Sequence, residues 1–170
     1  MLKHFDHLTI VVRDVDRAKA FFGVLGFKEA MSVVIAGEPF ASYMGVPGIE
    51  ADHVTLVLDN ASPRTEIQLL RYRHPDPVPD PNIRDLHKLG MNHICFAVDD
   101  IEAEVAKLKA NGFATRNQIM DFHSRKAGVH RRPGRRHDRT VAVALRRGVS
   151  QDRRSGVAAN HARSTRTITK

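Results

Sequence analysis

The chain has few of the features that would tie it to an oxidising compartment or to a membrane. Among its 170 residues Cys95 is the single cysteine, which excludes an intrachain disulfide and fits a reducing cytoplasm. No apolar run approaches the ~20 residues that a membrane-spanning helix needs. The first residues, MLKHFDHLT, lack the apolar segment of a secretory signal peptide. The sequence therefore predicts a cytoplasmic protein without a membrane partner.

Aromatic residues are missing from the whole segment after Lys126, and acidic residues are rare in it. Residues 1–125 contain 14 Lys and Arg against 17 Asp and Glu, whereas residues 126–170 contain 13 against 2. The net charge of +8 therefore comes entirely from the C-terminal segment. Such a segment would bind phosphates in a salt-sensitive way without reading sequence, so we expect nucleic-acid binding to be non-specific at most.

Two segments repeat one design 86 residues apart. HLTIVVRDVDRAKAFFGVLGF begins at His7, HICFAVDDIEAEVAKLKANGF begins at His93, and they align without a gap. Each opens with β-branched and aromatic residues that favour a strand. An aspartate then stands where a helix N-cap is expected, and a glycine where a helix ends. The sequence thus predicts strand, helix and second strand in both units. The matched pairs are His7 with His93, Val12 with Val98, Asp14 with Asp100, Val15 with Ile101, Ala20 with Ala106, Gly26 with Gly112 and Phe27 with Phe113.

The first unit continues with segments that are typical of strands, and a proline-rich segment follows it. The predicted strands are Lys28–Ile35, Phe40–Met44, His53–Leu58 and Glu66–Tyr72. HPDPVPDPN has proline at four alternate positions, which excludes a helix or a central strand and predicts an extended linker. The expected divisions are a first βαβββ module at 1–73, the linker at 74–90, the start of a second βαβββ module at 91–126 and a basic irregular tail at 127–170.

These segments resemble the vicinal oxygen chelate superfamily, which includes glyoxalase I, methylmalonyl-CoA epimerase, extradiol dioxygenases and bleomycin-resistance proteins. The residues that carry the resemblance are DHLTIVVRDVDRAKAFFGVLGF, TEIQLLRY and MNHICFAVDDIEAEVAKLKANGF, within roughly residues 4–125. The resemblance implies an α+β fold in which two βαβββ modules form a half-open barrel around one divalent metal. Here the second module is expected to be incomplete.

The resemblance also implies metal ligands on the first and last strands of each module. These would be His7, Gln68 and His93, with Gln68 standing where many members have glutamate. Two imidazoles and an amide oxygen are a plausible set of donors for Zn²⁺, Co²⁺, Ni²⁺, Mn²⁺ or Fe²⁺. A lone histidine is more often a barrel or surface residue, but a repeated pair together with Gln68 favours a metal site. For Gln68 alone, the competing interpretation is an ordinary hydrogen-bonded amide.

A fourth ligand is missing, and the tail suggests why. The family ends its second module with a GP-E-G turn and a strand carrying glutamate, and nothing after Lys126 matches. One permitted set of codons for residues 127–146, read one base later, encodes LVFIAGPEGVTIELSQWH and a stop. This reading supplies both missing strands and the glutamate. We therefore interpret residues 127–170 as the product of a one-base frameshift, against the alternatives of a solvated tail and a basic arm for nucleic acid.

The predicted function is a metal-dependent isomerase or lyase of the glyoxalase or epimerase type. It would act on a small carbonyl or thioester substrate by proton transfer through a metal-stabilised enediolate. The base that moves the proton would be the missing glutamate or another carboxylate. Glu50 and Asp52 are weak candidates, so the sequence assigns no catalytic residue. The alternatives are a metal-free drug-binding protein of the bleomycin-resistance type and an extradiol dioxygenase. The expected partners are a small-molecule substrate and a second copy in a homodimer.

Overall fold

The computed structural model describes residues 1–81, 87, 89–122, 125–131 and 140–146. It is an α+β fold with two four-stranded sheets, one in each half of the chain. The first half contains β1 (His7–Val11), α1 (Val15–Val24), β2 (Phe27–Ala36), α2 (Phe40–Met44), β3 (Glu50–Leu58) and β4 (Glu66–His74). The second contains β5 (His93–Ala97), α3 (Ile101–Ala110), β6 (Met120–Phe122), β7 (Arg125–Arg131) and β8 (Thr140–Arg146).

The repeat determines how both helices begin and end. Asp14 caps α1 by accepting a hydrogen bond from Arg17 N at 2.8 Å, and Asp100 caps α3 by accepting one from Ala103 N at 2.9 Å. Gly26 and Gly112 follow the helices with φ of 93° and 78°, in the region that glycine adopts most readily. The caps and glycine stops expected from the sequence are confirmed.

The first module forms a sheet in the order β1-β4-β3-β2, with β1 parallel to β4 and the other pairs antiparallel. Its topology is the expected βαβββ, but one predicted strand is wrong. Phe40–Met44 is the short helix α2, which lies between Pro39 and the left-handed Gly45 (φ 65°). Ala41 and Met44 pack against the small cluster of Ile35, Ile49, Ala51 and Leu70, so the segment buries apolar surface as a helical turn.

The second module repeats this order as β5-β8-β7-β6, again with a parallel pair, β5 and β8. It is the less complete module, because β6 covers 3 residues whereas β2 covers 10. Most of β7 and all of β8 lie after residue 126, in the segment that was expected to be an irregular tail. The sequence of β8 is TVAVALR, which alternates small and β-branched apolar residues. The division of the chain at residues 73, 90 and 126 stays a prediction.

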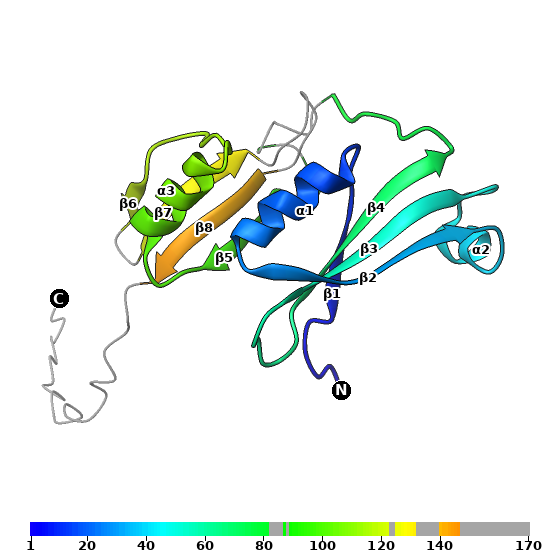
Figure 1. The fold of residues 1–170 in the computed structure, drawn as a ribbon, viewed down its shortest axis with the longest axis horizontal. Helices are drawn as coiled ribbons and strands as arrows, with labels where there is room; N and C mark the ends of the chain where they lie inside the picture. Colours follow the sequence, from blue (N-terminus) through cyan, green and yellow to red (C-terminus); the bar gives the residue numbers. More distant parts are fainter. Residues whose placement is uncertain (82–86, 88, 123–124, 132–139, 147–170) are drawn as a thin grey trace, which may run out of the picture.

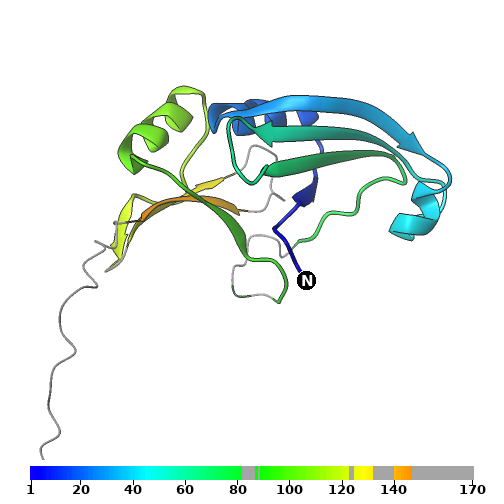
Figure 2. The ribbon, with the colours of Figure 1, turned by 90° about the horizontal axis from the view of Figure 1, so that it is seen from below.

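The two modules pack through α1, α3 and the start of β2 (Figure 1). Phe21 and Phe113 meet edge to face at 5.2 Å, and Phe27 and Phe96 at 5.6 Å. One core cluster therefore includes side chains of both modules. The sheets lie on either side of this core and do not close into a barrel (Figures 1 and 2). Among the described residues no helix has the length and apolar character needed to cross a membrane.

Candidate functional site

The first module has one sheet face turned away from α1, and His7 lies on it. Along β1, Leu8 and Ile10 point toward the core beneath α1, whereas His7 and Thr9 alternate to the other side and stay exposed. The strand period of two residues produces this alternation. His7 is aligned with Glu66 on β4, and Thr9 with Gln68. We call this surface the His7 face.

A hydrogen-bonded chain runs across the His7 face. Thr9 Oγ1 donates to Gln68 Oε1 at 3.1 Å, and Gln68 Nε2 donates to Glu66 Oε1 at 2.9 Å. The other carboxylate oxygen of Glu66 accepts from Arg64 Nε at 3.0 Å. The Glu66 side chain is 16 % exposed, so a mostly buried carboxylate lies next to His7 in the sheet. The sequence analysis missed Glu66, although its position two residues before Gln68 on the same strand is the signal that could have identified it.

Both repeated histidines use the same ring nitrogen for a contact with the preceding residue. His7 Nδ1 lies 2.6 Å from Asp6 Oδ2, and His93 Nδ1 lies 2.6 Å from Asn92 Oδ1. These oxygens can only accept, so each Nδ1 donates, and in the neutral imidazole Nε2 is then the nitrogen that carries the lone pair. The hydrogen bond from His7 also holds the pKa of the Asp6 carboxyl below its ordinary value. An imidazole oriented in this way by its neighbour is suited to bind a metal through Nε2.

His93 lies on the second sheet, at the position equivalent to His7. It alternates with Ile94 and Phe96, which turn toward the core. β1 and β5 are edge strands of different sheets, and they do not lie side by side in either view (Figures 1 and 2). Within the described ranges no three His, Cys, Asp or Glu side chains are grouped as a metal site. His7 and Gln68 thus share one face, and the convergence of both with His93 stays a prediction.

The His7 face also contains a buried hydroxyl and exposed apolar side chains. Thr55 on β3 is aligned with Gln68 and is only 3 % exposed, yet in the described part of the chain its Oγ1 has no hydrogen-bond partner. Leaving such a group unsatisfied costs about 1–3 kcal/mol. Val11, Met31 and Val33 project from the same face and are more than 40 % exposed. This combination suits a ligand with a polar group and an apolar portion.

The fourth-ligand position can be found from strand register. β1 places Thr9 opposite Gln68, and the equivalent pair in the second module is Cys95 opposite Ala142. Alanine has no atom that can bind a metal. β8 therefore occupies the position of the last strand of the module, but it does not carry a metal ligand at the position equivalent to Gln68. Asp138, another carboxylate that could take that role, lies outside the described residues.

The two weak candidates for a base are engaged elsewhere. Asp52 is aligned with Arg71, and Thr55 is aligned with Gln68. Because side chains alternate along a strand and Asp52 is three residues before Thr55, Asp52 lies on the opposite sheet face from Gln68. Arg73 contacts Asp52 at 2.6 Å and Glu50 at 3.1 Å. Hydrogen bonds from Arg73, and then from Arg71, hold the pKa of Asp52 below its ordinary value. These ion pairs form a structural cluster on β3 and β4, and the carboxylate of Asp52 is on the opposite sheet face from His7.

The other histidines of the first 126 residues have no counterpart in the repeat, so the sequence predicts that they are surface residues. His4, His74 and His87 are exposed as predicted, His53 is half-buried on the His7 face opposite Leu70, and His123 lies outside the described residues. Cys95 shares the exposed side of β5 with His93, as its spacing of two residues predicts, but it is not packed in the core, which was the interpretation favoured over a ligand role.

Comparison with known proteins places these features in a family. Residues 6–129 match the model of the Glyoxalase/Bleomycin resistance protein/Dioxygenase superfamily. The chain belongs to this superfamily. The match ends before β8, close to the point at which the resemblance was expected to stop.

Three known proteins illustrate what this chain is similar to. An ethylmalonyl-CoA/methylmalonyl-CoA epimerase of Cereibacter sphaeroides is 29 % identical over 137 residues, covering 78 % of this chain and 86 % of the epimerase. A glyoxalase family protein from Bacillus cereus is 21 % identical with a TM-score of 0.75, covering 87 % of this chain and 97 % of that one. A glyoxalase I variant from Zea mays is 15 % identical with a TM-score of 0.57, covering 81 % of this chain and 43 % of that one. The two solved structures support the fold of this superfamily member.

Proposed function

We propose that this chain is a divalent-metal-dependent isomerase or lyase of the glyoxalase or epimerase type. Its substrate would be a small carbonyl compound or thioester. The observation that carries the proposal is the register that puts His7, Gln68 and Glu66 on one sheet face of a member of this superfamily. The epimerase relative supports the thioester alternative, since its name describes action on acyl-CoA.

The donor set on the His7 face fits a borderline-hard divalent ion. His7 Nε2 and the Gln68 amide oxygen are neutral donors, and the aligned Glu66 carboxylate supplies negative charge. A bound divalent ion polarises a carbonyl oxygen and so acidifies the adjacent C–H. Thr9 and Glu66 hold the amide of Gln68 in place, which orients its oxygen. Glu66 is also the carboxylate best placed to accept a proton from a substrate carbon on this face.

The remaining side chains of the His7 face would bind the rest of the substrate. Thr55 Oγ1 offers a buried hydrogen bond beside Gln68, and Val11, Met31 and Val33 offer apolar contacts. A thioester with an apolar acyl group matches this arrangement. Because His7 and Gln68 are neutral and the ligand glutamate of β8 is absent, we expect metal binding to be weak.

Titration with Co²⁺, followed by the visible absorption of the bound ion, tests the metal site directly. The His7→Ala variant should bind Co²⁺ at least about tenfold more weakly, and Gln68→Glu should bind it more tightly because it adds a negative charge. His74→Ala, which removes an exposed histidine at the end of β4, is the matched control. Equal Co²⁺ affinity of the His7→Ala and His74→Ala variants would contradict the site.

Proton exchange tests the reaction. In D₂O with added metal, the chain should exchange the α-proton of an acyl-CoA or of the methylglyoxal–glutathione adduct, and Glu66→Gln should slow exchange about 10²-fold or more. The alternative is a metal-free binder of small apolar molecules, which the exposed valines and Met31 favour. That alternative predicts ligand binding that is unchanged by metal removal, without any proton exchange.

We further propose that the active unit is a homodimer in which sheets of two chains share a site. The support is that His7 and His93 lie on edge strands of sheets that do not pair within one chain. Mixing His7→Ala with His93→Ala chains tests this. A site shared between chains restores one intact site in each mixed dimer, whereas a site within one chain restores none.

A further inference from the structure

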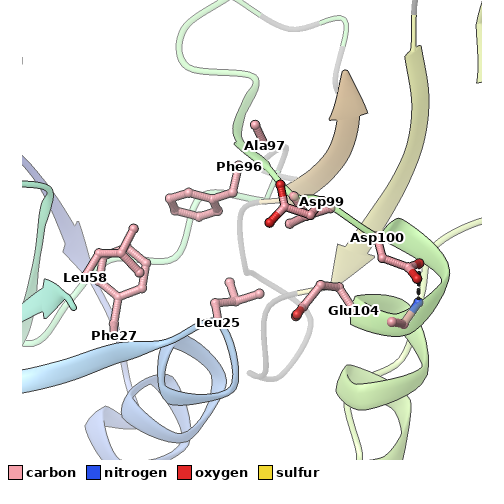
Figure 3. Close-up of a pocket in the computed structure, with 10 residues that line it drawn as sticks. Leu25, Phe27, Leu58, Phe96, Ala97, Asp99, Asp100 and Glu104 are labelled. Carbon is pink, nitrogen blue, oxygen red and sulfur yellow. Dashed lines mark hydrogen bonds between the residues drawn. The ribbon is translucent and has the colours of Figure 1, made fainter. Parts of the chain in front are cut away.

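A pocket lies where the two modules meet, away from the His7 face (Figure 3). Its volume of about 330 Å³ is at the lower end of the range for small-molecule sites, about 300–1,000 Å³. The apolar wall comes from Leu25 at the end of α1, Phe27 on β2, Leu58 on β3 and Phe96 on β5. Phe96 points to the side of β5 opposite His93, so the pocket is separate from the proposed metal site.

The other wall is acidic. Asp99, Asp100 and Glu104 line the pocket, and none of its lining residues is basic. Figure 3 shows the carboxylates of Asp99 and Glu104 on the side of the pocket facing Phe96 and Leu25, whereas Asp100 is turned to the helix N-terminus. Asp100 is engaged there with Ala103 N at 2.9 Å.

Helix stability accounts fully for Asp100 and partly for Glu104, which lies in the acidic first turn of α3, but it does not account for Asp99. Asp100 is the N-cap of α3, and Glu102 in the same turn is paired with Lys126 at 2.7 Å. Asp99 forms no hydrogen bond or ion pair with the described residues, and Glu104 has only Lys107, at 3.8 Å. Two carboxylates are thus left facing an apolar wall, which favours a positive charge between them.

We propose that this pocket binds a small organic cation with an apolar body. The ammonium group would lie between Asp99 and Glu104, and the body would lie against Leu25, Leu58 and Phe96. The carboxylates supply charge, and an aromatic face at Phe96 adds attraction for an ammonium group. A neutral or anionic molecule of the same shape would lose the charge interaction. The site is independent of metal binding on the His7 face.

Binding of benzylammonium to the full chain, followed through amide shifts in ¹H–¹⁵N NMR spectra, tests the proposal. The amides of Val98, Asp99, Ala103 and Glu104 should shift, and benzyl alcohol should bind more weakly. The double variant Asp99→Asn with Glu104→Gln should lose about tenfold in affinity for benzylammonium. Its affinity for benzyl alcohol should stay unchanged.

Two further variants separate charge from shape. Glu102→Gln removes one charge from the same helical turn outside the pocket and should change benzylammonium affinity less than about twofold. Ala103→Leu fills the pocket, keeps every carboxylate, and should weaken both ligands. The proposal is overturned if benzyl alcohol binds as tightly as benzylammonium, if the double variant behaves like Glu102→Gln, or if the shifted amides cluster around His7 and Gln68 instead.

Discussion

Replacing Phe113 with alanine should remove much of the attachment between the two modules. Phe113 follows α3, is 6 % exposed, and meets the fully buried ring of Phe21 edge to face at 5.2 Å. Truncating a buried phenylalanine to alanine typically costs about 3–5 kcal/mol in the free energy of unfolding. Since a whole domain has only about 5–15 kcal/mol, the Phe113→Ala chain should be close to unfolding at room temperature.

The edge-to-face contact between Phe113 and Phe21 should contribute separately to this loss of unfolding free energy. An aromatic pair contributes about 0.5–1.5 kcal/mol beyond the area it buries. Combining Phe113→Leu with Phe21→Leu in a double-mutant cycle should therefore give a coupling energy of that size. Leucine keeps most of the apolar volume, so these variants should remain folded well enough to measure.

Urea unfolding, followed by circular dichroism, is the assay, and Phe122→Ala is the matched control. Phe122 is in the same module on β6 but is 49 % exposed. Its truncation should cost about 1 kcal/mol or less, because about half of the residue is already exposed to water. If Phe113→Ala and Phe122→Ala lower the unfolding free energy equally, the second module does not dock on Phe21, and the description of a shared core is refuted.

The other predictions concern the α3 cap, acid stability and the strand β8. Asp100→Ala should destabilise the chain by about 1 kcal/mol through loss of the helix cap, whereas Asp99→Ala should leave the unfolding free energy nearly unchanged, as measured in urea. The folded-state pKa of Asp52 is depressed by Arg73, so its ion pair stabilises the fold above the unfolded value near 3.8 and that contribution is lost as pH falls through the lower folded value. The stability gap between the wild type and Asp52→Asn should accordingly be largest near pH 7 and shrink below about pH 4; a gap that stays constant down to pH 2 would contradict this ion pair. Ala142→Glu should tighten Co²⁺ binding by about tenfold relative to Ala144→Glu, since Ala142 is the register equivalent of Gln68. A chain with LVFIAGPEGVTIELSQWH in place of residues 127–170 should melt higher and turn over substrate faster than the 170-residue chain; equal melting and turnover would mean that the tail is a genuine part of the protein.

Local sequence determined the module design. The N-caps Asp14 and Asp100 and the glycines after each helix act within a few residues of themselves, so their effect can be predicted from short windows. The alternation of β1 and β4 likewise follows from a period of two, which puts His7 on the same side of β1 as Thr9, and Gln68 on the same side of β4 as Glu66. The superfamily could be recognised because these local signals recur 86 residues apart.

Tertiary structure decided everything that depends on contacts between distant segments. Phe40–Met44 became a helix because it packs on a cluster formed by β2, β3 and β4, which no local window contains. β8 lies beside β5 through a parallel pairing between segments more than 40 residues apart, which no short window of sequence reveals. The same pairing puts Ala142 at the position where a metal ligand was expected. Glu66 became a site residue only when β4 was aligned with β1. The acidic pocket exists only because packing of the two modules brings Leu25 and Leu58 of one against Phe96 and Glu104 of the other.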